Sequence, residues 1–172
     1  VPGRGFLNFS NKLLDLVVAA ALLIGGLYAA YALWDNLQIY TAANQVQLEM
    51  KKLKPVQTEE KGSDFSELQA LNHDVCAWIT LDGTNIDFPV LQGDTNLTYI
   101  NHDVYGDFSL SGSIFLDSGK RRDFTDPYSL IYGHHMENSL MFGDLELYED
   151  RTFFEENSTG TLLLPGETCR LE

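Results

Sequence analysis

The residues best suited to chemistry are four histidines and two cysteines. His134 and His135 follow Tyr132-Gly133 directly, at the end of a predicted strand. Catalytic side chains are often presented by loops at the ends of rigid elements. Successive side chains of an extended chain point to opposite faces, so we expect at most one of these two histidines to face a cleft. The alternative is a surface pair without a role.

Cys169 and Cys76 are the two candidate thiol nucleophiles. Cys169 lies in an alternating segment, and with His134 and Arg170 it would form a set suited to acyl transfer. Arg170 is its immediate neighbour, however, and on a strand it would point to the opposite face. Cys76 precedes an apolar run, Ala77-Trp78-Ile79, and is expected to be packed. A disulfide between the two cysteines is a further alternative, because sequence does not test its geometry.

The sequence does not favour a metal or cofactor site. His73 and His102 stand in Asn-His-Asp contexts, which are typical of turns and capping segments. No H-E-x-x-H or C-x-x-C spacing is present. The acidic residues are dispersed rather than arranged as a calcium-binding loop. We therefore expect no metal and no cofactor.

Length and composition narrow the class of protein. The chain has 172 residues, which suggests about one domain. It carries 11 basic and 25 acidic residues, and a formal net charge of −14 argues against a nucleic-acid binder. A hydrophobic content of 44% argues against wholesale disorder.

The N-terminal part is predicted to be a membrane anchor. Val17 to Trp34 is free of charge, and with residues 13–16 it makes about 33 Å of helix, enough for a hydrocarbon core of about 30 Å. Arg4 and Lys12 precede it, so the positive-inside rule places the N-terminus in the cytoplasm and the rest outside. We predict a cytoplasmic tail at 1–12 and a transmembrane signal anchor at 13–34. A cleaved signal peptide is the alternative.

The rest of the chain is predicted to be a juxtamembrane helix and linker at 35–63 and a β-rich domain at 64–172. A short helix is expected at 64–72 and another at 140–148, continuing through 151–154. Short strands are expected at 77–81, 86–91, 113–117, 129–134, 160–164 and 168–172. This spacing predicts a small barrel. Because the last strand would lack a partner, we expect the domain to continue past Glu172.

Five ordered motifs between Leu71 and Glu172 resemble those of sortases, most closely class B. They are Asn72–Ile79 (N-x-D-x-x-x-W-I), Gly83–Val90 (G-T-x-I-D-[YF]-P-V), Asp94–Ile100 (D-x-N-x-x-Y-[LI]), Gly112–Asp117 (G-S-I-F-x-D) and Ile131–Leu145 (Y-G-H-x-M, then M-F-x-x-L). Each motif alone is weak, but five in this order are specific. The predicted anchor and linker also fit this family.

The resemblance implies a mainly β fold, a sortase-like closed barrel of about eight strands with short helices. It implies a cysteine transpeptidase on the outer face of the cell membrane, acting on secreted proteins that bear a sorting signal of the N-P-x-T-N kind. The acyl group passes to an amine of a peptidoglycan precursor or to a pilin lysine. By its position in Tyr-Gly-His, His134 is the expected acid and base. Asn96 and Tyr99 are candidate substrate-groove residues.

The sequence also departs from the family pattern. The family cysteine sits in a T-L-x-T-C strand, with an arginine about one strand later. Cys169 imitates this motif but follows His134 by only 35 residues, too few for the intervening strands. We therefore expect the nucleophile and its arginine to lie beyond Glu172 and the chain as given to be inactive. The alternatives are an anchored, non-catalytic sortase-like binding module and a hydrolase that uses Cys169 with His134.

Overall fold

The computed structural model describes residues 3–58 and 62–172. The contacts divide the chain into two compact units, residues 1–38 and 39–172. One helix, α1 (Gly3–Lys52), contributes to both units.

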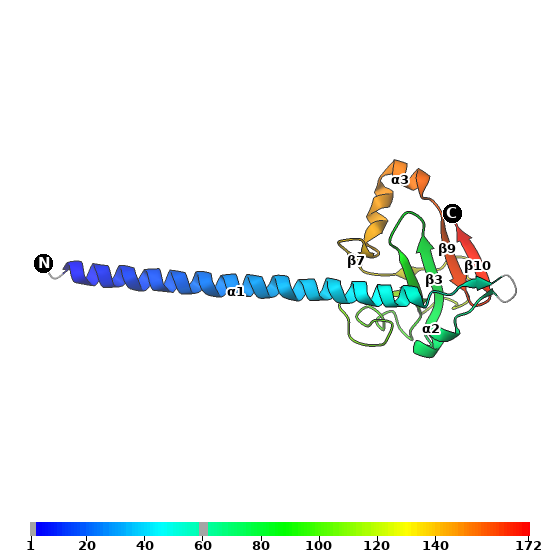
Figure 1. The fold of residues 1–172 in the computed structure, drawn as a ribbon, viewed down its shortest axis with the longest axis horizontal. Helices are drawn as coiled ribbons and strands as arrows, with labels where there is room; N and C mark the ends of the chain where they lie inside the picture. Colours follow the sequence, from blue (N-terminus) through cyan, green and yellow to red (C-terminus); the bar gives the residue numbers. More distant parts are fainter. Residues whose placement is uncertain (1–2, 59–61) are drawn as a thin grey trace. The chain divides into compact units, whose positions relative to one another are not determined.

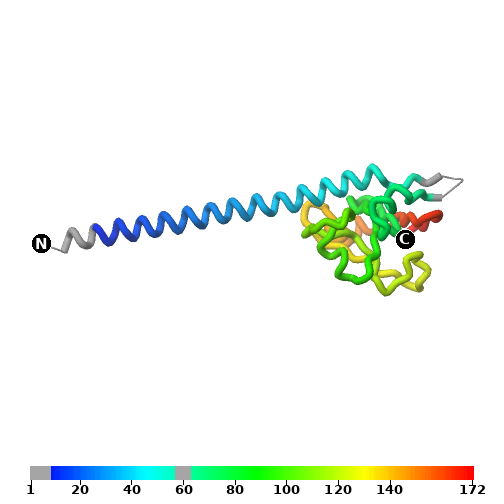
Figure 2. Tube along the Cα trace, turned by 90° about the horizontal axis from the view of Figure 1, so that it is seen from below, coloured from blue at the N-terminus to red at the C-terminus, as the bar shows by residue number. Residues whose placement is uncertain are grey.

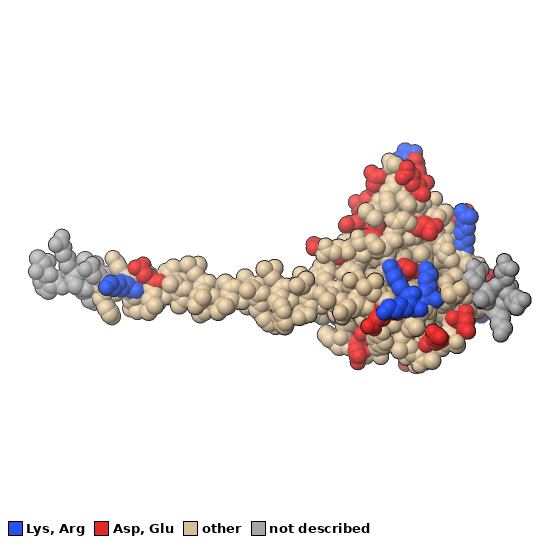
Figure 3. Space-filling view, viewed as in Figure 1, with Lys and Arg blue, Asp and Glu red and all other residues tan. Residues whose placement is uncertain are grey.

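In the first unit, α1 contains a long apolar stretch between Asp15 and Asp35. Its most hydrophobic 18-residue window has a mean hydropathy of 2.2, and none of that window is buried. The long middle stretch of the helix shows neither acidic nor basic side chains (Figure 3). Within the part of the chain that the structure describes, this is the one helix long and apolar enough to cross a membrane, by length and composition.

In the second unit, the last turns of α1 are part of the folded domain. Ala43, Gln47 and Met50 are buried, and the Gln47 amide donates to the Asn85 carbonyl at 2.8 Å. Figure 2 follows this end of the helix, in cyan, along the domain. Pro55 stands shortly after the helix ends at Lys52, and proline does not continue a helix.

A six-stranded sheet forms the centre of the domain, in the order β10-β9-β3-β4-β5-β6 (Figure 1). All neighbours are antiparallel except β4 and β5. The strands are β3 (Val75–Leu81), β4 (Asp87–Leu91), β5 (Ile114–Leu116), β6 (Ile131–Tyr132), β9 (Gly160–Leu164) and β10 (Glu167–Leu171). In this order β10 and β6 are the two edge strands. Closure of the sheet into a barrel stays a prediction.

Two small ladders and three short helices complete the domain. The ladders pair β1 (Gln57–Thr58) with β2 (Gly62–Ser63) and β7 (His135–Met136) with β8 (Leu140–Met141). The helices are α2 (Ser66–Leu71), the 3-10 helix η1 (Gly143–Glu149) and α3 (Arg151–Glu156). Acidic side chains gather over the projecting segment that carries α3 (Figure 3).

The helix expected at 140–148 begins later than its apolar pattern indicates. Leu140 and Met141 pair with β7 as strand β8, and the helical turns start only at Gly143. The backbone groups of Leu140 and Met141 pair with β7, so they do not form the first turn of a helix. Tertiary pairing thus overrides the local helical pattern.

The sheet is covered on both faces, so its central strands are buried on both sides. Val75 to Trp78 are all buried rather than alternating between core and solvent. One hydrophobic cluster surrounds Cys76 and Phe88. The other contains Trp78 together with Met50 of α1, so the end of α1 covers one face of the sheet.

Candidate functional site

His134 follows β6 directly and lines a shallow groove of about 220 Å³. The other lining residues are Ile100, Phe115, Tyr132 and Gly133. Gly133, before His134, is closely packed, because a Cβ there would lie 2.3 Å from the end of the Ile114 side chain and 2.8 Å from the Phe142 ring. The backbone of His134 is fixed by its carbonyl, which accepts from the Phe142 amide at 2.9 Å. The imidazole is therefore carried by a closely packed segment.

His135 occupies a different environment. It is exposed, and its Nε2 lies 3.3 Å from a carboxylate oxygen of Glu146. It is not among the residues that line the groove. Of the two adjacent histidines, only His134 lies on the groove, which agrees with the expected alternation of side chains.

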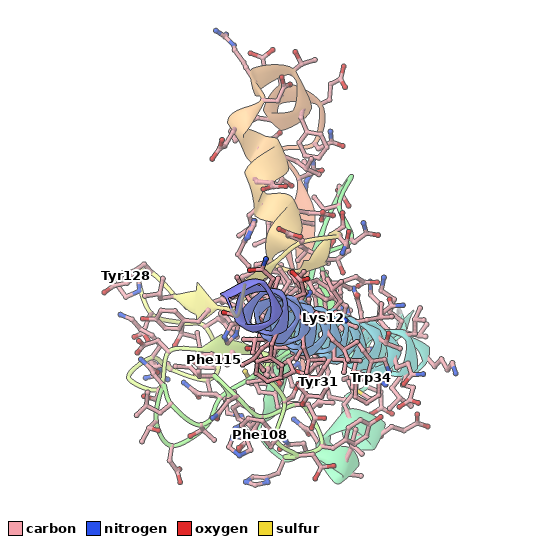
Figure 4. The ribbon with its side chains drawn as sticks, turned by 90° about the vertical axis from the view of Figure 1, so that its left-hand side faces the viewer. Lys12, Tyr31, Trp34, Phe108, Phe115 and Tyr128 are labelled. Carbon is pink, nitrogen blue, oxygen red and sulfur yellow. The ribbon has the colours of Figure 1, made fainter. Side chains whose placement is uncertain are left out.

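The side wall of the groove is an aromatic pair. Tyr132 and Phe115 lie in register on β6 and β5, and their rings stack with centroids 5.3 Å apart. Figure 4 shows Phe115 within the domain, whereas Tyr128 lies out on a loop. The Tyr132 hydroxyl donates to Asp117 Oδ2 at 3.2 Å. Desolvation and then this carboxylate raise the pKa of Tyr132.

Asn96 is not among the residues that line the groove. Its Nδ2 donates to Asp117 Oδ2 at 2.8 Å, and its Oδ1 accepts from the Ser118 amide at 2.7 Å. The bond from Asn96, followed by one from the Gly119 amide, lowers the pKa of Asp117. Asn96 thus reaches the groove through Asp117 and Tyr132.

Tyr99 is a core residue, 4% exposed. Its hydroxyl donates to Asp74 Oδ2 at 2.7 Å and accepts from Asn72 Nδ2 at 3.0 Å. Burial, and then the bond to Asp74, raise the pKa of Tyr99 to about 12. Its neighbour Ile100 is the residue of this segment that lines the groove. A substrate role for Asn96 or Tyr99 stays a prediction.

The sequence reasoning missed Ile100, Phe115 and Tyr132 as groove residues, and Asp117 as the carboxylate bonded to Tyr132. Signals for three of them were present in the motifs. Tyr132 stands two residues before His134, and Phe115 and Asp117 close the G-S-I-F-x-D segment. Nothing in the sequence distinguished the exposed Ile100 from the buried Tyr99.

Both cysteines are free thiols. Cys76 is 2% exposed, and its thiol donates to the Val90 carbonyl at 3.4 Å. Burial raises the pKa of Cys76 to about 12, so its reactive thiolate is strongly disfavoured. Cys76 is packed in the core, as expected.

Cys169 lies on β10 and packs against the core cluster that contains Cys76. Arg170 is exposed on the other side of the strand and pairs with Glu172 at 3.2 Å. The order of the sheet puts β10 and β6 at opposite edges, with four strands between them. His134 follows β6, so the two candidate partners of a thiol site belong to opposite sheet edges.

The described residues hold no group of three or more His, Cys, Asp or Glu side chains that could bind a metal ion. The chemistry available at the groove is therefore that of an imidazole beside an apolar, partly aromatic wall. Such a site suits proton transfer to or from a group of an extended peptide lying in the groove.

Known proteins similar to this chain are sortases of one class. Sortase B of Listeria monocytogenes is 32% identical over 155 residues, which cover 88% of this chain and 63% of that protein. The crystal structure of sortase B from Bacillus anthracis matches with a TM-score of 0.73 and 27% identity, over 79% of this chain and 67% of that one. A class B sortase of Streptococcus pyogenes involved in pilus biogenesis matches with a TM-score of 0.60 and 44% identity, over 62% of this chain and 59% of that one. No family model matches.

The sheet with its short helices is thus a sortase fold. Within that class, the chain is related to the class B sortases. The chain spans less than two thirds of the length of the Listeria relative.

Proposed function

We propose that this chain carries the histidine half of a sortase B transpeptidase site, with His134 as its acid and base. The observation that supports this most is that His134, and not His135, lies on a groove in a chain related to class B sortases. The groove is lined by the stacked pair Phe115 and Tyr132 and by His134. The proposed substrate is a secreted protein with a sorting signal of the N-P-x-T-N kind.

The proposed reaction has two steps. A thiolate attacks the threonine carbonyl, a C–S bond forms, the C–N bond breaks, and His134 gives its proton to the departing amine. An incoming amine then attacks the thioester, transfers a proton to His134 and releases the thiolate. The proposed acceptor is an amine of a peptidoglycan precursor or a pilin lysine. The pilin option draws support from the Streptococcus pyogenes relative, which is involved in pilus biogenesis.

We propose that neither cysteine of residues 1–172 is the nucleophile. Cys76 is buried with a raised pKa, and Cys169 belongs to the sheet edge opposite that of His134. The chain as given should then bind the signal without cleaving it. The alternative of a thiol hydrolase needs Cys169 beside His134, and the order of the sheet disfavours it.

We propose that α1 anchors the protein in the cell membrane as a single span, with the N-terminus in the cytoplasm and the domain outside. The uncharged, unburied stretch of α1 and the basic residues before it support this topology. We also propose that this sheet is part of a closed barrel. The two edge strands β6 and β10 support this, because exposed edges invite further pairing.

A labelled Asn-Pro-Ala-Thr-Asn peptide tests the proposal. Fluorescence anisotropy should detect binding to the chain, and a peptide of scrambled order should bind more weakly. Mass spectrometry of the mixture should show no thioester on Cys76 or Cys169. A thioester that disappears in Cys169→Ala would overturn the assignment and support the hydrolase, whereas equal binding of both peptides would overturn the proposed signal.

A further inference from the structure

One carboxylate is bonded to the groove residue Tyr132 and to Asn96, which lies in the same turn segment as the groove residue Ile100. Asp117 follows β5, and its Oδ2 accepts from Asn96 Nδ2 at 2.8 Å and from the Tyr132 hydroxyl at 3.2 Å. Its other oxygen, Oδ1, accepts from the Gly119 amide at 2.8 Å. Asn96 and Tyr132 belong to segments far apart in the sequence, and Asp117 is the group that they share.

Each partner of Asp117 leads to one wall of the groove. Tyr132 forms the aromatic wall next to Gly133 and His134. Asn96 stands near the start of the segment that ends at Ile100, a residue of the groove lining. The far end of that segment is held by a bond from the Ser113 amide to the Tyr99 carbonyl at 3.0 Å. The Asn96–Asp117 bond holds its near end.

The backbone of Asp117 is itself well fixed. Its amide donates to the Leu130 carbonyl at 2.8 Å, which extends the β5–β6 ladder by one bond. Its carbonyl accepts from Gln92 Nε2 at 2.9 Å. A carboxylate on such a rigid backbone can hold mobile donors in one place. It is also suited to two neutral donors at once, because an ionised carboxylate only accepts hydrogen bonds.

We propose that Asp117 is a positioning residue that fixes the Tyr132 wall and the Asn96–Ile100 wall beside His134 before the peptide arrives. This rests on the proposed function, since it concerns how the same groove takes its peptide. Side chains that are already ordered lose less entropy on binding, so pre-organisation appears as affinity. Asp117 acts through Tyr132 and Asn96 and does not itself touch the substrate.

The test uses Asp117→Asn, which keeps the shape of the side chain and removes its charge. Asp123→Asn is the matched control. Asp123 lies in the same loop and loses the same charge, but it bonds to Arg121 and Thr125 rather than to groove segments. We expect Asp117→Asn to weaken binding of the labelled Asn-Pro-Ala-Thr-Asn peptide about tenfold, in line with one hydrogen bond to a charged acceptor, and Asp123→Asn to leave it within about twofold.

A second measurement separates positioning from general loss of structure. Tyr132→Phe should also weaken binding, and the double variant Asp117→Asn/Tyr132→Phe should be no weaker than Asp117→Asn alone, because the bond that Tyr132→Phe removes is already affected by Asp117→Asn. In the peptide-free protein, NMR of Cζ-labelled tyrosine should show the Tyr132 signal shifted by Asp117→Asn and unmoved by Asp123→Asn. Thermal melts of all variants identify any that do not fold.

The outcomes distinguish the two claims. If the wild-type chain binds the peptide and Asp117→Asn binds equally well, the positioning role is overturned while the proposed function stands. If the wild-type chain does not bind the peptide, the proposed signal fails, and the Tyr132 signal alone decides whether Asp117 positions the wall. An unshifted Tyr132 signal overturns the inference in either case.

Discussion

Single residues next to each other in this sequence differ sharply in their surroundings. Alternation along an extended chain predicted this for His134 and His135 and for Cys169 and Arg170, and the structure places each pair accordingly. Alternation could not be applied to Tyr99 and Ile100, because residues 96–100 form turns rather than a strand. Without a regular period, sequence could not tell which of the two faces the core.

At the residue scale, the two thiols should react at very different rates. Cys76 is 2% exposed with a raised pKa, whereas Cys169 is only partly buried on an edge strand. Because the thiolate is the reactive form, we expect a disulfide reagent such as DTNB to label Cys169 at least about tenfold faster at pH 8. Cys76 should react only after unfolding. Equal rates in Cys76→Ala and Cys169→Ala variants would contradict the buried placement of Cys76.

Asp87 should make stability depend on acid pH. Partial burial would raise its pKa, but hydrogen bonds from Lys54, Trp78 and Thr80 outweigh this and lower it. A depressed folded-state pKa stabilises the domain above the unfolded value of about 3.9, and that stabilisation is lost as the pH falls through the folded-state pKa. Asp87→Asn should cost about 1–3 kcal/mol at pH 7.

Urea unfolding followed by tryptophan fluorescence measures this effect. The difference between wild type and Asp87→Asn should be constant from pH 5 to 7 and shrink below about pH 4. Asp94→Asn removes the same charge from an exposed carboxyl, and it serves as the control. A gap that stays constant down to pH 2 would show that the Asp87 network does not act through its charge.

At the scale of elements, some segments of five or six residues were predicted well, whereas the two-residue pairings of β7 and β8 were not. The strand at 160–164 was predicted with its observed bounds, and α2 (Ser66–Leu71) lies within the predicted 64–72. The β7–β8 hairpin was missed, because its two strands have two residues each and its partners are set by contacts rather than by a period. Its turn also holds Asn138 and Ser139 at positive φ, and Met141 of β8 has a positive φ too, which non-glycine residues seldom adopt.

The end of α1 should contribute to the stability of the domain. Met50 is 2% exposed in the cluster that contains Trp78, whereas Leu48, two residues earlier, is 53% exposed. We expect Met50→Ala to lower the free energy of unfolding by about 2–5 kcal/mol. Leu48→Ala should change it by no more than about 0.5 kcal/mol. Similar values for the two variants would mean that the helix end does not pack against the sheet in solution.

At the scale of the whole molecule, sequence predicted an apolar N-terminal segment and a β-rich domain. The motifs supplied the fold family, which hydrophobic periodicity alone could not. The boundaries at residues 34 and 63 stay predictions, whereas the contacts divide the chain at residue 38. The two divisions differ because the helix-spaced apolar residues after Trp34 were interpreted as part of a linker. In the structure, Ala43, Gln47 and Met50 of this segment are buried in the domain.

The apolar stretch of α1 should hold the protein in membranes. On expression in a bacterium, residues 1–172 should stay with the membrane fraction after alkaline carbonate washing, because about 20 apolar residues cross a bilayer stably. A variant with Leu22, Leu23 and Ile24 changed to Asp, Asp and Lys should be released, since charge at the centre of a span costs several kcal/mol. Release of the unmodified chain would contradict the anchor.

Imidazole NMR can show directly whether the groove at His134 receives the sorting signal. The ring signals of the four histidines, assigned with single His→Gln variants, are followed as the Asn-Pro-Ala-Thr-Asn peptide is added. We expect the His134 signal to move and saturate with the binding curve, while those of exposed His135 and His73 stay in place. A His134 signal that does not move while the peptide binds would place the peptide elsewhere and contradict the assignment of this groove as the peptide-binding site.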